Sequence, residues 1–246
     1  LLPGNVHAFN IKGLHPLPPY GVFSTFSTES LKQNKAGFAF NIEKSSDPDF
    51  YRYFLQIAYG VTDRVELNLT VPYVQDWEDH LDGLEDSSIG LKHRIIDETK
   101  TMPAIGYLLT ASLPTGRDSF STNGMLGIGL LVSKKVGPFK GHANFFYLSP
   151  GKSELEDEYS LNLGAELSIA HNAKILAELS GKKDYFKNKI NLLEWRLGYR
   201  VAVNDNVYTT VGAGFDFKDR SPDYRLMFSI SVILPKEVQP IQRVIE

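Results

Sequence analysis

The chain from Glu194 to Leu234 reads EWRLGYRVAVNDNVYTTVGAGFDFKDRSPDYRLMFSISVIL. Three runs in it alternate strictly between apolar residues and polar or small ones. A period of two predicts β-strands, and the polar stretches between the runs predict the turns of an antiparallel meander. One face is almost wholly apolar with aromatic residues near its ends, and the other is charged, small or glycine. This combination is typical of transmembrane β-barrel strands.

The apolar face of these three runs is therefore expected to point outward, into lipid. It consists of Leu193, Trp195, Leu197, Tyr199 and Val201 in the first run, Val207, Thr209, Val211, Ala213, Phe215 and Phe217 in the second, and Tyr224, Leu226, Phe228, Ile230, Val232 and Leu234 in the third.

The same alternation recurs along the preceding chain and brings the number of strands to about twelve, an even number as in bacterial single-chain barrels. The earlier runs are 35–43, 51–59, 65–74, 88–96, 103–113, 124–133, 139–148, 158–169 and 174–182. Short connections alternate with longer, more polar ones, so all the short turns fall on one rim. Outer-membrane barrels have short periplasmic turns and longer external loops, and we therefore expect both termini on the periplasmic side.

Three parts of the chain are distinguished by pattern: a leader at 1–34, a transmembrane barrel at 35–234 and a polar tail at 235–246. The leader contains Leu14-His15-Pro16-Leu17-Pro18-Pro19-Tyr20, whose prolines cannot donate to a strand ladder. We expect it to lie on or inside the barrel, with a partly disordered terminus as the alternative. Because the chain begins at Leu1 without methionine, we also expect that a signal peptide has been removed.

Composition excludes several classes of protein. The 246 residues are 42% hydrophobic, yet no stretch approaches the roughly 18 to 20 continuous apolar residues of a spanning helix. A barrel strand escapes that test because every second residue can be polar. The net charge of −3 gives no argument for nucleic acid as a partner. The absence of cysteine removes disulfides, thiol nucleophiles and cysteine metal sites.

Alternation alone does not say which face is buried, and a soluble sandwich or lipocalin-like barrel would turn the apolar face inward. Three features favour the membrane. The first is a set of tyrosines near strand ends, where amphipathic rings suit the lipid–water boundary. They are Tyr51, Tyr73, Tyr147, Tyr159 and Tyr224 at the long-loop end, and Tyr59 and Tyr199 toward the short-turn end.

The second and third features lie on the polar face. It carries many glycines, as a crowded barrel interior favours, and it carries charges of both signs in mid-strand. Rings of charged side chains set the selectivity of pores, so we predict that these charges line the lumen, with pairing across the wall as the alternative role. The predicted pore-lining residues are Arg52, Glu66, Lys92, Arg94, Glu166, Glu178, Glu194, Arg196, Arg200, Asp216 and Arg225.

Several short motifs resemble one known family. They are GVTDRVEL at 60–67 followed by Pro72-Tyr73, GLEDSSIGLK at 83–92, and LPTG at 113–116. Together they resemble the outer-membrane channels named for the MetA pathway of phenol degradation. The resemblance implies a channel for small, often aromatic or hydrophobic, molecules, without established catalytic residues. Glu85 stands where that family often has glycine, and His93 where it often has an aromatic residue.

Catalytic and metal sites find little support. No phosphate-binding loop or zinc motif is present, and no two of the six histidines have ligand spacing. His93 near Ser87 and Ser88 is the best hydrolase candidate, but no orienting group is visible. The acidic stretch from Asp76 to Asp86 could bind calcium, although its spacing matches no known loop and solvated charge is the preferred interpretation. We therefore predict no catalytic residues, no cofactor and no metal.

The sequence thus predicts an all-β, up-and-down transmembrane barrel in a bacterial outer membrane, with the lipid bilayer and a small solute as its partners. It does not determine the oligomeric state, for which a monomer is the favoured interpretation. The expected function is passive transport of small molecules, hydrophobic or aromatic ones included. The alternatives are a plugged barrel with a structural or partner-docking role and, third, an outer-membrane lipid hydrolase.

Overall fold

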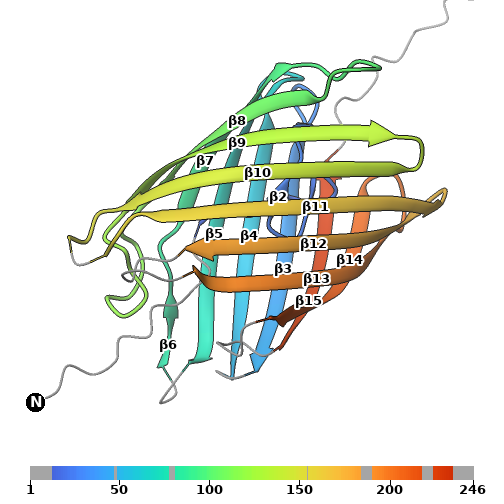
Figure 1. The fold of residues 1–246 in the computed structure, drawn as a ribbon. Helices are drawn as coiled ribbons and strands as arrows, with labels where there is room; N and C mark the ends of the chain where they lie inside the picture. The colour runs from blue at the N-terminus through green and yellow to red at the C-terminus, as the bar shows by residue number, and fades with distance from the viewer. Residues whose placement is uncertain are drawn as a thin grey trace, which may run out of the picture.

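A computed structural model describes residues 13–46, 49–77, 81–153, 155–183, 190–217 and 224–234. Twelve strands form a closed antiparallel barrel in which each strand pairs with the next one along the chain (Figure 1). The barrel closes where the last strand pairs with the first, from Tyr224 opposite Ser46 to Leu234 opposite Ala36. None of the described residues forms a helix long and apolar enough to cross a membrane.

The barrel strands agree closely with the predicted runs. They are β3 (Ala36–Ser46), β4 (Phe50–Gly60), β5 (Val65–Trp77), β7 (Ser88–Ile96), β8 (Ala104–Ser112), β9 (Met125–Val136), β10 (Phe139–Pro150), β11 (Glu158–Ala170), β12 (Ala173–Lys183), β13 (Ile190–Ala202), β14 (Val207–Asp216) and β15 (Tyr224–Leu234). The predicted twelve-stranded barrel is confirmed. One additional strand was not predicted: β6 (Leu81–Leu84) lies in the acidic stretch and extends the ladder of β5.

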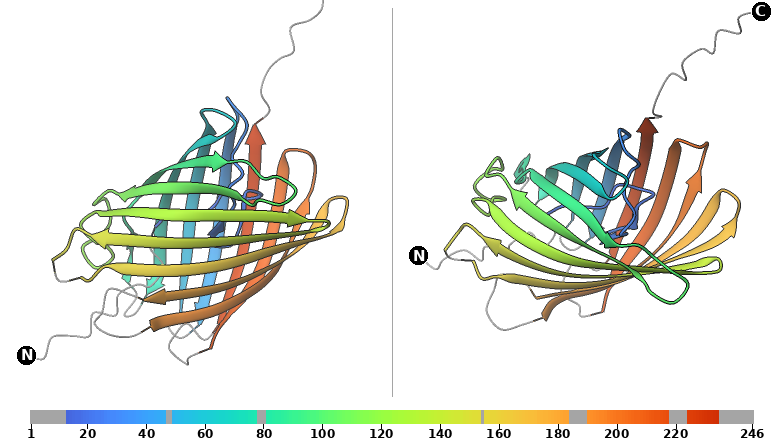
Figure 2. Two further views of the ribbon diagram at one scale, coloured as in Figure 1. Left: turned by 45° about the horizontal axis from the view of Figure 1, so that its top comes forward. Right: turned by 90° about the horizontal axis from the view of Figure 1, so that it is seen from above.

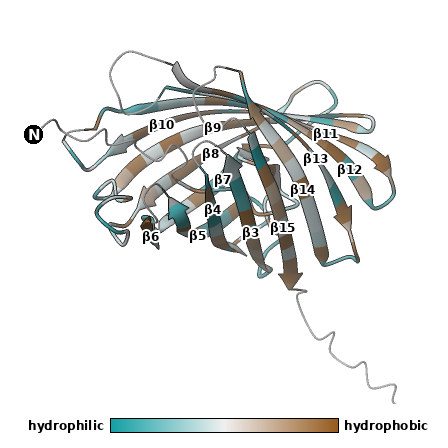
Figure 3. Cartoon of the chain, turned by 90° about the horizontal axis from the view of Figure 1, so that it is seen from below, coloured by the Kyte–Doolittle hydropathy of each residue, from teal (hydrophilic) through white to brown (hydrophobic). Residues whose placement is uncertain are grey.

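The apolar face of the strands points away from the barrel axis. Leu126 is 69% exposed and Leu130 is 52% exposed, and many large apolar side chains on the outward face of the other strands are also exposed. Apolar and polar residues alternate along the strands, as the hydropathy colours show (Figure 3). An apolar belt of this extent is covered by lipid, and closure of the sheet satisfies the backbone groups that lipid cannot. The soluble alternative, with the apolar face packed inward, is therefore wrong.

The described part of the leader, residues 13–34, lies inside the barrel (Figure 2). Its described part begins near the long-loop rim, where Gly13 is beside the first residue of β9, Met125. It then forms a small hairpin from β1 (Gly21–Val22) and β2 (Thr25–Phe26). At the short-turn rim the backbone N–H of Asn34 donates to the carbonyl oxygen of Gly60 at 2.7 Å.

Between residues 20 and 28 the leader thus forms a hairpin of two two-residue strands. The first barrel strand begins and the last one ends at the short-turn rim, but residues 1–12 and 235–246 lie outside the described residues. The predicted periplasmic location of the two termini therefore stays a prediction.

The apolar core lies between the leader and the inner wall. Phe26 of the leader packs against Leu108, Leu131 and Phe146 of three adjacent strands. On the other side of the lumen, two more leader residues pack against the wall, Leu17 and Leu31, together with Ala39, Ala58 and Ile233. The leader therefore contributes to the stability of the barrel by removing apolar surface from water.

Candidate functional site

Nine of the eleven predicted pore-lining residues are buried inside the barrel: Arg52, Glu66, Lys92, Glu166, Glu178, Glu194, Arg196, Arg200 and Arg225. The other two are half-buried at opposite rims. Arg94 pairs with Asp97 at 2.8 Å and donates to the backbone oxygen of Asp63 at 3.0 Å, at the short-turn rim. Asp216 ends β14 at the long-loop rim.

Glu178 is the main attachment point of the leader. Its carboxylate accepts from the backbone N–H of Ser24 at 2.9 Å and of Thr25 at 2.8 Å. It also accepts from the hydroxyl groups of Ser24 at 2.6 Å and Thr25 at 2.7 Å. Arg196 completes this arrangement by pairing with Glu178 at 2.7 Å and donating to the Ser24 hydroxyl at 2.7 Å. Glu178 and Arg196 thus hold the hairpin turn against β12 and β13.

Glu178 and Arg196 stand at one end of a row of side chains with alternating charges along the inner wall. The ion pairs toward the two ends of the row are short: 2.8 Å between Arg52 and Glu85, and 2.9 Å between Arg196 and Glu194. The middle links through Arg225 are 3.4 Å to Glu194 and 3.8 Å to Glu43. In spatial order the row is Glu85, Arg52, Glu43, Arg225, Glu194, Arg196, Glu178.

Alternating signs neutralise one another, which is how buried charges become tolerable. Glu43 is the last residue of the predicted run 35–43, where alternation turns it inward, and Glu85 lies in a loop, where no period applies. Both were missed as lumen residues.

Two lysines hold the leader nearer the short-turn rim. Lys92 pairs with Glu66 at 2.8 Å and donates to the backbone oxygen of Glu29 at 2.6 Å. Glu66 in turn accepts from the backbone N–H of Leu31 at 2.7 Å. Lys140 pairs with the Glu29 carboxylate at 2.5 Å. The wall charges at this level therefore bind backbone groups of the leader as well as each other.

Ser133, His142 and Glu166 form a line across three adjacent strands. His142 Nδ1 is 2.8 Å from the Ser133 hydroxyl, and His142 Nε2 is 3.2 Å from Glu166. These are the residue types of a hydrolase triad, which sequence analysis did not find. The Ser133 hydroxyl is buried and accepts from the backbone N–H of Thr28 at 3.0 Å, so it holds the leader.

The predicted hydrolase candidate is not assembled. His93 points outward, and its Nδ1 lies 3.2 Å from the hydroxyl of Tyr107. Ser88 is buried on the inner face of the same strand. Ser87 lies just before that strand and binds the Thr115 hydroxyl at 3.0 Å. The tyrosines predicted for the membrane interface lie on the outer surface and are partly or largely exposed: Tyr51, Tyr59, Tyr73, Tyr147, Tyr159, Tyr199 and Tyr224.

The glycines of the inner face mark where the leader contacts the wall. A Cβ on Gly90 would lie 2.1 Å from the side chain of Leu14, and a Cβ on Gly37 would lie 2.3 Å from that of Leu17. A Cβ on Gly212 would lie 2.4 Å from the ring of the leader's Phe23. The wall has no room for larger residues at these points because leader side chains occupy the space.

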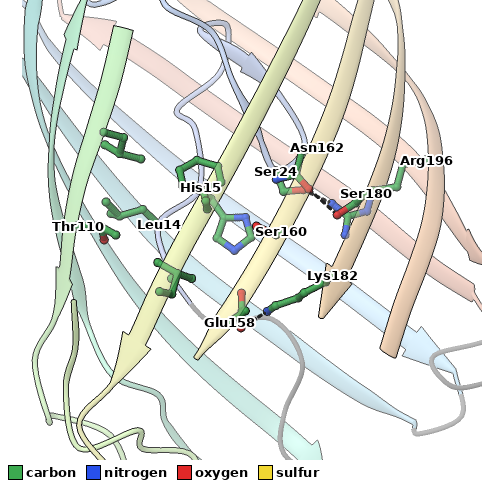
Figure 4. A pocket seen from close by; sticks show the side chains of 14 residues that line it. Leu14, His15, Ser24, Thr110, Glu158, Ser160, Asn162, Ser180, Lys182 and Arg196 are labelled. Atoms are coloured by element: carbon green, nitrogen blue, oxygen red, sulfur yellow. Dashed lines mark hydrogen bonds and ion pairs between the residues drawn. The ribbon is translucent and has the colours of Figure 1, made fainter. Parts of the chain in front are cut away.

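Cavities lie beside the leader in the described part of the chain, and two of them are lined by both leader and wall residues. The larger, of about 80 Å³, has a polar wall and an apolar one (Figure 4). The polar wall includes Lys182, paired with Glu158 at 2.8 Å, and Asn162, whose side-chain oxygen accepts from the Ser180 hydroxyl at 2.6 Å. The apolar wall is Leu14, Leu108, Phe146 and Leu148. A polar cavity of this size has room for several water molecules.

Inward apolar residues of β8, β9 and β10 were also missed by sequence analysis. Leu108, Leu131 and Phe146 face the leader, while their neighbours Leu109, Leu130 and Phe145 face outward. The signal was present as adjacent pairs of large apolar residues, which indicate a strand that is apolar on both faces. Such pairs predict that something apolar fills the lumen at that level.

The acidic stretch folds onto the neighbouring long loop. The pKa of Asp86 would be raised by burial, but hydrogen bonds hold it below its usual range. The donors include the hydroxyl and backbone N–H of Thr122, at 2.8 and 2.7 Å, and the backbone N–H of Gly116 at 3.1 Å. Residues 78–80 lie outside the described part, and within that part no group of three acidic or histidine side chains could hold a metal ion.

Comparison with solved structures relates this fold to membrane channels. The COG4313 outer membrane channel from Pseudomonas putida F1 has a TM-score of 0.67 and 14% identity, covering 84% of this chain and 98% of that one. The NanC porin has a TM-score of 0.61 and 7% identity over 81% of this chain and all of that one. The KdgM porin has a TM-score of 0.59 and 11% identity over 82% and 99%.

The chain shares the barrel fold of these three proteins. No family model and no curated protein sequence matches it. At identities this low the likeness establishes the fold alone, and the resemblance to the MetA-pathway channels stays a prediction.

Proposed function

We propose that this protein is a passive outer-membrane channel for small molecules, hydrophobic or aromatic ones included, as in the MetA-pathway family that its motifs resemble. The observation that carries the proposal is a lumen that the leader fills only in part. A cavity of about 80 Å³ lies on one side of the leader and one of about 40 Å³ on the other. The lipid-facing belt and the fold shared with channels and porins support a bacterial outer-membrane location.

The charged lumen residues would then act on both the solute and the leader. Because most of them are already paired, they contribute less to ion selectivity than an open ring of charges would. The route past the leader is narrow, which favours small solutes over oligomers.

A plugged barrel with a structural or partner-docking role is the second candidate. It is favoured by the density of hydrogen bonds between wall and leader, at Glu178 above all. The two functions differ in one measurable property, the passage of solutes through the lumen.

A disulfide that reversibly ties the leader to the barrel wall distinguishes the channel from the plugged barrel. Thr25 Cβ lies 3.0 Å from the position of a Cβ on Gly164, so a shift of the leader by about 0.5 Å or more would bring the pair to the spacing of roughly 3.5–4.5 Å that a disulfide needs. The chain has no cysteine of its own. The Thr25→Cys, Gly164→Cys double variant and wild type are compared by liposome swelling with solutes of increasing size, oxidised and reduced.

Swelling in the oxidised form means that solutes pass beside the leader, and swelling only after reduction means that the leader moves. Either result supports a channel. If neither wild type nor the reduced variant admits any solute, the plugged barrel is correct.

A further inference from the structure

Arg200 differs from the other buried cations of the lumen. Its Nε donates to the Thr210 hydroxyl at 3.0 Å, and its Nη1 donates to the backbone oxygen of Pro19 at 3.2 Å. Both partners are neutral. Among the described residues no carboxylate lies within 4.0 Å of Arg200, although its side chain is only 3% exposed.

Its neighbours in the lumen are all paired with glutamates: Arg52 with Glu85 at 2.8 Å, Lys92 with Glu66 at 2.8 Å, Lys182 with Glu158 at 2.8 Å, Arg196 with Glu178 at 2.7 Å and Arg225 with Glu194 at 3.4 Å. A guanidinium group has five N–H donors, and the bonds of Arg200 to Thr210 and Pro19 occupy two of them. Burying a cation without a counter-charge is costly, so a negative partner at this position would be bound favourably.

The second cavity, of about 40 Å³, lies directly beside this group. Arg200 and Thr210 line it together with Phe23 of the leader and Met227 of β15. Glu43 also lines it, but that carboxylate lies between two cations, at 3.9 Å from Arg52 and 3.8 Å from Arg225. The cavity therefore combines a cation that has no carboxylate within 4.0 Å among the described residues with apolar and aromatic side chains, and polar groups of Asn41, Gln56 and Ser229 also line it.

We propose that this cavity binds a small organic carboxylate with an apolar body, held by the free guanidinium N–H groups of Arg200. A planar guanidinium matches a carboxylate in a two-point contact, and such charge-assisted bonds are stronger than neutral ones. The ring of Phe23 and the side chain of Met227 take the apolar body. The inference deepens the proposed channel function by naming a class of solute. Binding itself can occur without transport, and only the interpretation of the bound molecule as a solute rests on the proposed function.

The test measures binding rather than transport. Benzoate and benzamide have the same shape and differ in charge, so isothermal titration of the detergent-solubilised protein with each one isolates the role of the carboxylate. We expect wild type to bind benzoate at least tenfold more tightly than benzamide. Arg200→Gln should abolish this preference, and Arg200→Lys should retain part of it because the charge remains. Arg94→Gln, which removes a cation at the rim, is the matched control and should behave as wild type.

Equal affinity for the two ligands, or a benzoate affinity unchanged in Arg200→Gln, would show that the proposal is wrong. Heat-modified gel mobility and circular dichroism of each variant confirm a folded barrel, and Arg200→Lys remains informative if Arg200→Gln fails to fold. Liposome swelling with benzoate separates the two ideas: binding without flux retains the site and rejects the channel, whereas flux without binding does the reverse.

Discussion

Replacing Glu178 with glutamine should release the leader from the wall. One carboxylate accepts four hydrogen bonds from Ser24 and Thr25, between 2.6 and 2.9 Å, and pairs with Arg196 at 2.7 Å. An amide has a single acceptor oxygen, and its nitrogen would face a hydroxyl group or a guanidinium group that also donates. The variant therefore loses the ion pair and at least one bond to the leader.

Removing one partner of a buried ion pair costs about 3 to 5 kcal/mol. If that loss falls on the state with the leader bound, the population with the leader released rises roughly a hundredfold or more. Single-channel recording in planar bilayers should then show large, infrequent openings in Glu178→Gln that wild type lacks. Glu194→Gln is the matched control, because Glu194 pairs with the same arginine at 2.9 Å, and no hydrogen bond or ion pair joins it to the described part of the leader.

Indistinguishable current traces from Glu178→Gln and wild type would refute this reasoning. Large openings of equal frequency in both variants would show that the charge row matters as a whole and that the direct contacts with the leader do not.

Three further predictions concern other contacts. Gly212→Ala places a Cβ 2.4 Å from the ring of Phe23 and should speed amide hydrogen exchange in the hairpin, with a cost of about 1–3 kcal/mol, whereas Gly181→Ala, with no neighbour closer than 3.8 Å, should not. Asp86→Asn should lower the free energy of unfolding at pH 7 by about 1.5–3 kcal/mol, the value of a hydrogen bond to a charged group. Because the pKa of Asp86 is lowered in the fold, this difference in unfolding free energy should persist as pH falls to the ordinary carboxyl pKa. It should disappear as pH falls further, through the lowered pKa. Urea unfolding at several pH values measures this dependence. Leu163→Arg, at a side chain 44% exposed in mid-strand, should cost about 2–4 kcal/mol in lipid, and Leu113→Arg at the rim no more than about 1 kcal/mol; equal costs in liposome unfolding would argue against a membrane belt at this height.

The barrel could be predicted because each strand meets two environments, lipid outside and a polar lumen inside. That difference imposes a period of two on every strand and left β7 and β15 with the predicted bounds, Ser88–Ile96 and Tyr224–Leu234. β6 escaped prediction because its four residues, Leu81–Leu84, are too few to establish a period. Only the pairing with β5 makes it a strand.

The partners of the lumen charges could not be predicted. Their inward direction follows from alternation, but the contacts of Glu178 join residues 153 and 154 positions apart in the chain. No local pattern encodes such a distance. For the same reason the hydrogen bonds of Asn144 with the backbone of Phe26, at 2.6 and 3.0 Å, and the line from Ser133 to Glu166 appear only in three dimensions.

The positions of several glycines in the barrel wall nevertheless reflect the path of the leader. Strand glycines cost conformational entropy and contribute no packing, so they persist where another group needs their space. Gly90, Gly37 and Gly212 receive Leu14, Leu17 and Phe23 in turn, so the glycines follow the leader from the long-loop third of the lumen to the short-turn rim and back to the middle. A wall built only to conduct solutes would gain nothing from these close contacts. The combination of a fitted leader, cavities on both sides of it and one unneutralised arginine suits a channel that admits small solutes individually, past a segment that belongs to the folded barrel.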